Sequence, residues 1–299
     1  MVTLDGSALT LESVAAVARR NEAAEVDAAA ISRMRKSRDV VDRLASGDDP
    51  VYAVNTGVGY LSDQRVPAAD IEQLQLNVVR SHACGVGDPL PADVVRAMML
   101  IRANVLAKGF SGIRPVIARR MCGLLNKGVT PVVPSRGSVG ASGDLAPLAH
   151  MALVLIGEGE AEHEGRRMVG GEAMASAGLE PVRLQAKEGI SLVNGTQAML
   201  ACGGLALVDA EELAEIADAA CALSLDALRG TPRAFDPRIH AARPHPRQVE
   251  CAAFMRQLIA GSTFTRPDDP PEAIDHLRGI CQAVYPVPMR RSLVHYKTL

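Results

Sequence analysis

The residues whose types and spacing could support chemistry are concentrated in the stretch Gly137–Leu148, which reads Gly-Ser-Val-Gly-Ala-Ser-Gly-Asp-Leu-Ala-Pro-Leu. A glycine-rich turn that leads into a helix presents backbone N–H groups and can hold an anion. The stretch contains neither Gly-x-Gly-x-x-Gly nor a Gly-Lys-Ser/Thr ending, the two usual phosphate patterns. It also differs from the Gly-x-Ser-x-Gly turn of hydrolases, because Asp144 stands where the last glycine should be. The simplest interpretation is a glycine-rich helix cap.

A more specific interpretation follows from Ala141-Ser142-Gly143. The amide nitrogen of Gly143 can attack the carbonyl carbon of Ala141 if the backbone bends sharply, and a glycine beside a small residue allows that bend. Loss of one water on ring closure and of a second from Ser142 leaves a methylidene-imidazolone. This group is a strong electrophile, which no ordinary side chain provides.

The segment from Gly137 through His150 resembles the histidine, phenylalanine and tyrosine ammonia-lyase family, and its histidine-type members above all. The resemblance implies that Ala141, Ser142 and Gly143 form the cofactor 4-methylideneimidazole-5-one (MIO) autocatalytically. It implies elimination of ammonia from L-histidine to give urocanate. A tyrosine or phenylalanine ammonia-lyase or aminomutase is the alternative enzyme, and an inactive homologue acting as an assembly subunit is the alternative of another class. A serine hydrolase using Ser142 is disfavoured by the missing hydrolase pattern.

Two further segments resemble the family at positions close to its substrate. Tyr52 opens the loop Tyr-Ala-Val-Asn-Thr-Gly-Val-Gly, and the resemblance implies an active-site tyrosine near the reacting amino acid; the alternative is a loop tyrosine packed on the core. Ser81-His82 matches the histidine-type pattern, which implies that His82 contacts the substrate. A histidine can hydrogen-bond to an imidazole or to a phenol hydroxyl. The alternative for His82 is a histidine at a helix end with local hydrogen bonds.

Asn194 lies in the segment Asn-Gly-Thr-Gln, which the family also shows after Lys-Glu-Gly. By resemblance, Asn194 donates a hydrogen bond to the MIO oxygen and strengthens the electrophile. Alternatively it caps the long helix that follows, and one side chain could do both. His240 and His245 lie in a Pro-rich connection and are interpreted as structural. No metal site is expected, because only Asp236 stands near them as a weak third ligand.

The composition favours a mainly α fold. The chain has 299 residues, of which 48% are hydrophobic and only 3% aromatic, with no Trp. A core of Ala, Val, Leu, Ile and Met suits packed helices better than a β-sandwich. The formal charge of −2 gives no electrostatic footprint for nucleic acid or an anionic membrane. Six Cys without a Cys-x-x-Cys pair indicate free thiols of a reducing compartment, so we expect a cytoplasmic protein.

Apolar periodicity and caps predict four main helices. Their ranges are Asp27–Ser46, Pro91–Gly109, Asp144–Gly157 and Gly195–Leu228. We expect the carboxylate of Asp144 to cap the helix that follows it, and a short β-like stretch around Glu160–Met168. The apolar runs Leu145–Ile156 and Ala198–Val208 are too short to span a membrane.

These elements predict a mainly α fold with a loop-rich N-terminal part, and the resemblance implies that its long helices form a bundle of the ammonia-lyase type. Residues 1–190 are expected to be the MIO-forming domain, and residues 191–299 the start of the central helical bundle, truncated relative to the family. The resemblance covers roughly residues 40–262. Beyond it, Gln282 and Tyr285 keep the family spacing, but Arg290 and Arg291 are out of register for the arginine that binds the substrate carboxylate. A truncated lyase, a divergent minimal member and a subunit completed by another polypeptide all explain this.

The expected partners are a small amino acid substrate and further copies of the chain. Family active sites are assembled from several subunits of a tetramer, which implies a homotetramer. The long C-terminal helix should also expose apolar side chains that the N-terminal part cannot cover. These residues are Ala198, Leu200, Leu205, Val208, Leu213, Ile216, Ala220, Leu223 and Leu225.

Overall fold

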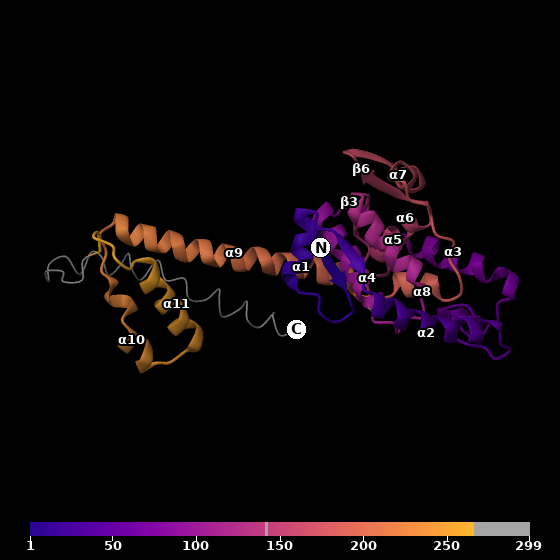
Figure 1. Ribbon diagram of the computed structural model, residues 1–299, viewed down its shortest axis with the longest axis horizontal. Helices are drawn as coiled ribbons and strands as arrows, with labels where there is room; N and C mark the ends of the chain where they lie inside the picture. Colours follow the sequence, from indigo (N-terminus) through magenta and orange to yellow (C-terminus); the bar gives the residue numbers. More distant parts are fainter. Residues whose placement is uncertain (141–142, 266–299) are drawn as a thin grey trace. The chain divides into compact units, whose positions relative to one another are not determined.

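The computed structural model describes residues 1–140 and 143–265, and it is dominated by helices, as predicted (Figure 1). The chain forms two compact units, Met1–Leu205 and Ala206–Leu299. The compact units divide after Leu205, later in the chain than the sequence-based division at residue 190. The expected roles of the two parts stay predictions.

The first unit contains eight helices and the beginning of a ninth within the described residues. They are α1 (Leu11–Arg20), α2 (Ala28–Ser46), α3 (Ile71–His82), α4 (Ala92–Ala107), α5 (Pro115–Asn126), α6 (Leu145–Leu155), α7 (Gly170–Ser176), α8 (Glu188–Val193) and α9 (Gln197–Ala227), which continues into the second unit. Short 3-10 turns lie at Gly59–Leu61 and Ala68–Asp70.

Three small sheets accompany these helices. Strands β1 (Val2–Leu4) and β2 (Ala24–Val26) are parallel, and β3 (Val86–Pro89) pairs antiparallel with β5 (Pro134–Arg136). The third sheet joins β4 (Thr130–Pro131), β6 (Glu160–His163) and β7 (Arg166–Val169) in antiparallel order β4-β6-β7. The last two strands form a hairpin, which confirms the β-like stretch expected around Glu160–Met168.

Helix α4 lies at the centre of the first unit and packs against α1, α2 and α5. Its sequence is apolar almost all the way round, which is typical of a helix with no solvent face. Met98, Met99, Leu100 and Leu106 are fully buried. The predicted helix start after Pro91 and the end before Gly109 are both confirmed. The same holds for α2, where Asp27 Oδ2 accepts a hydrogen bond from Ala30 N at 3.0 Å.

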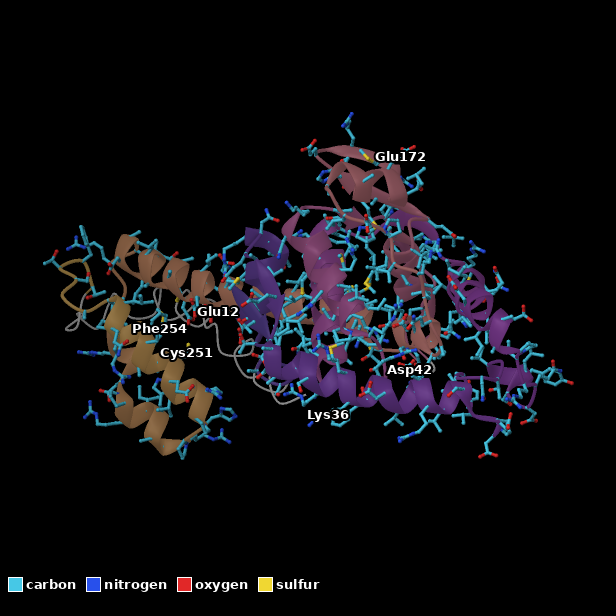
Figure 2. The ribbon with its side chains drawn as sticks, turned by 45° about the vertical axis from the view of Figure 1, so that its right-hand side comes forward. Glu12, Lys36, Asp42, Glu172, Cys251 and Phe254 are labelled. Atoms are coloured by element: carbon cyan, nitrogen blue, oxygen red, sulfur yellow. The ribbon has the colours of Figure 1, made fainter. Side chains whose placement is uncertain are left out.

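The second unit joins the remainder of α9 to η3 (Pro232–Phe235), α10 (Pro237–Ala242) and α11 (Pro246–Leu258). Its core residues are Cys221, Ala222, Leu225, Phe235, Cys251, Ala252, Met255 and Ile259; Cys251 lies on α11 (Figure 2). His240 is buried, with Nε2 3.1 Å from Ala234 O and Nδ1 3.2 Å from the Gln248 amide nitrogen. These bonds support the structural interpretation of His240.

Helix α9 exposes a large share of its apolar side chains. Of the nine residues expected to be uncovered, Leu200, Leu213, Ile216 and Leu223 are at least half exposed, at 50%, 54%, 56% and 71%. Ala198, Leu205 and Leu225 are buried instead. The segment Glu188–Ala227 is long and apolar enough to cross a membrane, which differs from the expectation that every apolar run is too short. Because the central helix of a bundle has the same length and composition, this finding alone does not favour a membrane.

Candidate functional site

Asp144 ties the start of α6 to the start of α9. Its carboxylate is buried; Oδ1 accepts a hydrogen bond from Ser138 Oγ at 2.7 Å, and Oδ2 accepts one from Met199 N at 2.9 Å. The Asp144 amide donates to Gly195 O at 2.5 Å. The expectation that Asp144 caps the helix after it is therefore wrong, since its side chain makes no capping bond to α6. It instead satisfies an unpaired N–H in the first turn of α9.

Gly143 packs directly against the backbone of Gly195. Its φ is +103°, a backbone conformation that residues other than glycine rarely adopt. In addition, a Cβ atom on this residue would lie 2.5 Å from Gly195 O and 2.9 Å from Gly195 N. Only glycine fits, so the structure brings the end of Ala-Ser-Gly against the segment that carries Asn194. Ala141 and Ser142 themselves lie outside the described residues.

Asn194 follows the last residue of α8, and its amide N–H donates to Ile190 O at 3.0 Å. Its side chain is exposed and makes no hydrogen bond to any residue that the structure describes. It therefore does not cap α9, whose first turn is bonded to Asp144. Its carboxamide is therefore available to donate a hydrogen bond, and the next residue, Gly195, contacts Gly143.

Helix α8, which ends before Asn194, is held by two buried side chains. Gln75 of α3 accepts a hydrogen bond from Gly189 N through Oε1 at 2.9 Å. Glu188, fully buried, accepts from Arg114 Nε at 2.8 Å and from Arg114 Nη2 at 2.7 Å. The position of Asn194 therefore depends on α3 and on the loop before α5.

His82 is the last residue of α3, and one of its ring nitrogens is engaged locally. Nδ1 lies 2.7 Å from Val78 O and 3.2 Å from Ser81 Oγ. Nε2 makes no hydrogen bond within the described residues, and the side chain is half-buried. The alternative that His82 is a helix-end histidine with local hydrogen bonds explains the contacts of Nδ1 but gives no partner for Nε2. Contact between Nε2 and a substrate stays a prediction.

His150 joins the His82 segment to the Gly137 segment, a role that the sequence analysis missed. Its Nε2 accepts a hydrogen bond from Gly85 N at 3.0 Å, and burial lowers the pKa of the imidazole, which favours this neutral acceptor. A Cβ on Gly85 would lie 3.1 Å from His150 Nε2. The signal in the sequence was a histidine in an otherwise apolar helix.

Tyr52 is 56% exposed, and its hydroxyl accepts a hydrogen bond from Gly59 N at 3.4 Å, within its own loop. The loop is rigid beneath it, because buried Asn55 accepts from Val51 N at 2.7 Å and donates to Asp49 O at 2.9 Å. Among the described residues, Tyr52 makes no hydrogen bond to Gly143 or Asn194. The structure thus brings Gly143 against Gly195, which follows Asn194, but does not join Tyr52 to this contact.

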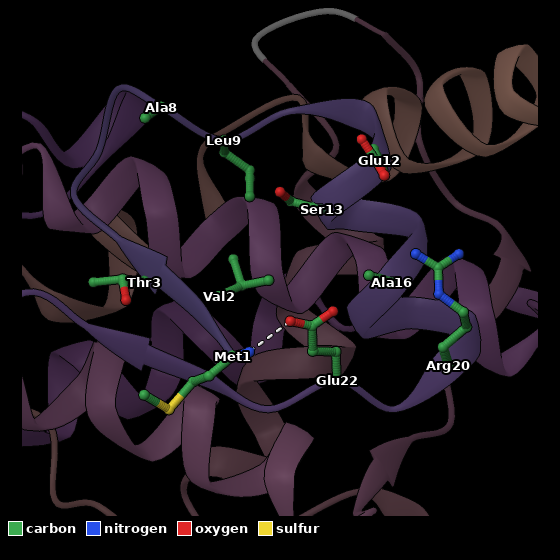
Figure 3. A pocket seen from close by; sticks show the side chains of 10 residues that line it. All are labelled: Met1, Val2, Thr3, Ala8, Leu9, Glu12, Ser13, Ala16, Arg20 and Glu22. Atoms are coloured by element: carbon green, nitrogen blue, oxygen red, sulfur yellow. Dashed lines mark hydrogen bonds and ion pairs between the residues drawn. The ribbon is translucent and has the colours of Figure 1, made fainter.

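A cavity of about 310 Å³ lies at the N-terminus, lined by Met1, Val2, Thr3, Ala8, Leu9, Glu12, Ser13, Ala16, Arg20 and Glu22 (Figure 3). It contains none of the predicted site residues, and the α-amino group at its edge is paired with Glu22 at 2.6 Å. No group of three His, Cys, Asp or Glu side chains that could hold a metal occurs within residues 1–140 and 143–265.

Comparison with known proteins shows relatives of one kind. Residues 9–292 match the family described as aromatic amino acid lyase. A histidine ammonia-lyase of Koribacter versatilis is 56% identical over 87% of this chain and 50% of its own length. The tyrosine aminomutase structure from Streptomyces globisporus has a TM-score of 0.87 at 38% identity, covering 98% of this chain and 59% of that one. The histidine ammonia-lyase structure from Trypanosoma cruzi has a TM-score of 0.80 at 38% identity, covering 85% and 49%.

The chain spans about half the length of the curated relatives it matches. The family match itself extends further than the range expected from the sequence, at both ends, and includes Arg290 and Arg291. Both arginines lie outside the described residues. The structure therefore does not test whether either of them takes the position of the arginine that binds the substrate carboxylate in the family.

Proposed function

Because this chain belongs to the aromatic amino acid lyase family, we propose that it acts as an ammonia-lyase that converts L-histidine to urocanate and ammonia. The observation that supports the proposal is the contact of Gly143, the last residue of Ala-Ser-Gly, with Gly195, the residue that follows Asn194. Identity of 50–56% to several histidine ammonia-lyases supports histidine as the substrate.

The residues present suit an MIO group formed from Ala141, Ser142 and Gly143. Ring closure needs a strongly bent backbone, and Gly143 has the positive φ that permits such a bend. Asp144 N and Asp144 Oδ1 fix the chain immediately after the ring-forming residues. The group would supply an electrophilic carbon that accepts electrons from the substrate.

The remaining proposed roles belong to side chains of this chain. Asn194 would donate a hydrogen bond to the ring oxygen, where negative charge accumulates. His82 Nε2 would hydrogen-bond to the imidazole of the substrate and orient it. Tyr52, with its hydroxyl ionised, would accept a proton from the substrate β-carbon on its phenolate oxygen as ammonia leaves the α-carbon. The resemblance to a family whose active sites are assembled from several subunits suggests that another copy of the chain contributes to the site in which Tyr52 acts.

A tyrosine-specific ammonia-lyase or aminomutase is the second candidate, favoured by the fold similarity to tyrosine aminomutase. Incubation with L-histidine, L-tyrosine and L-phenylalanine separates the two candidates. We expect urocanate from histidine, no cinnamate or coumarate, and no β-amino acid. Products from tyrosine alone would contradict the histidine assignment, and an unmodified intact mass without any product would contradict the lyase proposal.

Replacing Asn194 by alanine should separate cofactor formation from turnover. Asn194→Ala leaves Gly143 and Gly195 in place, so the chain should still lose two water molecules on maturation. The rate of urocanate formation should fall by about 10²–10³, the usual cost of one preorganised donor. Absorbance at the urocanate band measures the rate, with Asn77→Ala, an exposed position on α3, as the control. Unchanged turnover in Asn194→Ala would exclude the donor role.

We propose further that the chain self-associates, as a tetramer if the family arrangement is kept. Leu213, Ile216 and Leu223 on α9 are each more than half exposed, and exposed apolar side chains on one helix favour association with another protein surface. Sedimentation velocity should show a species heavier than the monomer. In a double variant that carries Leu223→Lys and Ile216→Lys, the sedimentation coefficient should fall toward that of the monomer. A stable monomeric wild type would contradict this proposal.

A further inference from the structure

Arg102 of α4 is a buried arginine whose guanidinium points at the junction between α8 and α9. Its side chain is 3% exposed. Nη1 donates to Gln197 Oε1 at 3.0 Å, and Nη2 donates to Ser191 O, the carbonyl of a residue in α8. One planar side chain thus binds both sides of the turn formed by residues 194–196.

The charge of Arg102 is not neutralised by any carboxylate within the described residues. Its Nε makes no hydrogen bond, and burial lowers the pKa of the guanidinium to about 10. Lys187, whose pKa is lowered by burial and then by Arg102, donates to Ser111 O at 2.9 Å and to Ser191 Oγ at 3.4 Å. Burying the Arg102 guanidinium without a carboxylate partner is costly, and the half-buried Lys187 adds a second positive charge beside it.

Gly195 is the contact between this cation and the Ala-Ser-Gly sequence. A Cβ on Gly195 would overlap Arg102 Nη1 and Gln197 Oε1, so the guanidinium lies directly against the glycine. The same glycine meets Gly143, since its carbonyl oxygen accepts from Asp144 N at 2.5 Å. Gly195 is therefore the one residue between the Arg102 guanidinium and Gly143.

We infer that Arg102 is a positioning residue that holds the Asn194 turn against Gly143 and gives this junction the positive potential that favours negative charge on an electrophile there. The inference rests on the proposed function, because it assigns a purpose to the unpaired cation at the ring-forming residues. A guanidinium fixed by two hydrogen bonds supplies both effects, whereas a lysine supplies charge without the second bond.

The test compares Arg102→Met and Arg102→Lys with Arg96→Met. Arg96 is the matched control: it lies on the same helix, is 5% exposed, and donates to Val17 O, Ala18 O and Leu125 O, far along the sequence from the site residues. Each variant is treated with cyanide, a small nucleophile that leaves free thiols unmodified. Intact mass then gives the fraction that has lost two waters and the rate at which that fraction gains one hydrogen cyanide.

We expect cyanide to add about tenfold more slowly to dehydrated Arg102→Met than to wild type, with Arg102→Lys between them and Arg96→Met at the wild-type rate. If Arg102 had a purely structural role, its replacement would lower the fraction of dehydrated chains without changing the rate at which cyanide adds to those chains. Equal rates in Arg102→Met and Arg96→Met would overturn the inference. If Arg102→Met gives no dehydrated chain, Arg102→Lys decides: a severalfold slower addition supports the inference, and the wild-type rate overturns it.

Hydrogen exchange distinguishes this inference from the proposed function. If wild type keeps both waters, the proposed function fails, but the amides of residues 194–199 still report the positioning. Faster exchange of these amides in Arg102→Met than in Arg96→Met supports the positioning role of Arg102 without the cofactor. Equal exchange in the two variants overturns it.

Discussion

Ser142→Ala should abolish maturation and turnover together. The methylidene carbon comes from the Ser142 side chain by loss of its hydroxyl as water, and alanine has no hydroxyl to lose. A second Ala-Ser-Gly stands at residues 45–47, but Gly47 has a φ of −79°, whereas Gly143 has the positive φ that ring closure needs. Intact mass should show the wild-type chain lighter by two water molecules than its sequence predicts, and Ser142→Ala without that loss.

Ser135→Ala is the control for this prediction, since Ser135 is exposed on β5 only a few residues before the motif. It should lose two waters as wild type does and turn over histidine at the same rate. Turnover of histidine by Ser142→Ala above the uncatalysed rate would show that the chemistry does not depend on Ser142. A two-water loss in Ser142→Ala would show that the dehydration occurs elsewhere in the chain.

The features that the sequence analysis predicted correctly are local in the chain. Asp27 before α2, Pro91 before α4 and the glycines after these helices act within one turn of their own position, so neighbouring residues suffice to recognise them. The Ala-Ser-Gly motif is contiguous for the same reason. The role of Asn194 as a donor to the MIO oxygen came from family resemblance and stays a prediction; the structure shows the contact of the next residue, Gly195, with Gly143.

The features that it missed depend on contacts between distant segments. Asp144 was assigned to the helix beside it because side-chain capping is usually local, yet its carboxylate bonds to Met199 N, fifty-five residues away. Arg96 and Arg102 stand in an almost wholly apolar helix, which does indicate burial, but nothing in the sequence identifies the carbonyls that they bind. The partner of a buried charge is set by tertiary packing and not by periodicity.

Glu188→Ala should have the largest effect on stability of any substitution that leaves the motif intact. Both carboxylate oxygens are used: Oε1 accepts from Arg114 N at 3.1 Å and from Nε, and Oε2 accepts from Arg114 Nη2 and from Gln185 N at 2.8 Å. Arg38 Nη1 lies 3.8 Å from Oε1. Alanine would leave Arg114 without its carboxylate partner and several buried N–H groups unpaired, so we expect a loss of about 3–5 kcal/mol in the free energy of unfolding.

Urea unfolding measures this loss, with Glu172→Ala on α7 as the control because Glu172 is exposed (Figure 2). The free energy of unfolding of Glu172→Ala should stay within about 0.5 kcal/mol of the wild-type value, as is usual for surface substitutions. The free energy of unfolding of Glu188→Gln should lie between those of Glu188→Ala and Glu172→Ala. The glutamine amide keeps one acceptor oxygen but turns its N–H donor toward Gln185 N or Arg114. A Glu188→Ala midpoint equal to that of Glu172→Ala would show that the buried pair contributes nothing. Because Glu188 begins the helix that ends before Asn194, the dehydrated fraction of Glu188→Gln should fall as well, which links the stability of this ion pair to the geometry at Gly143.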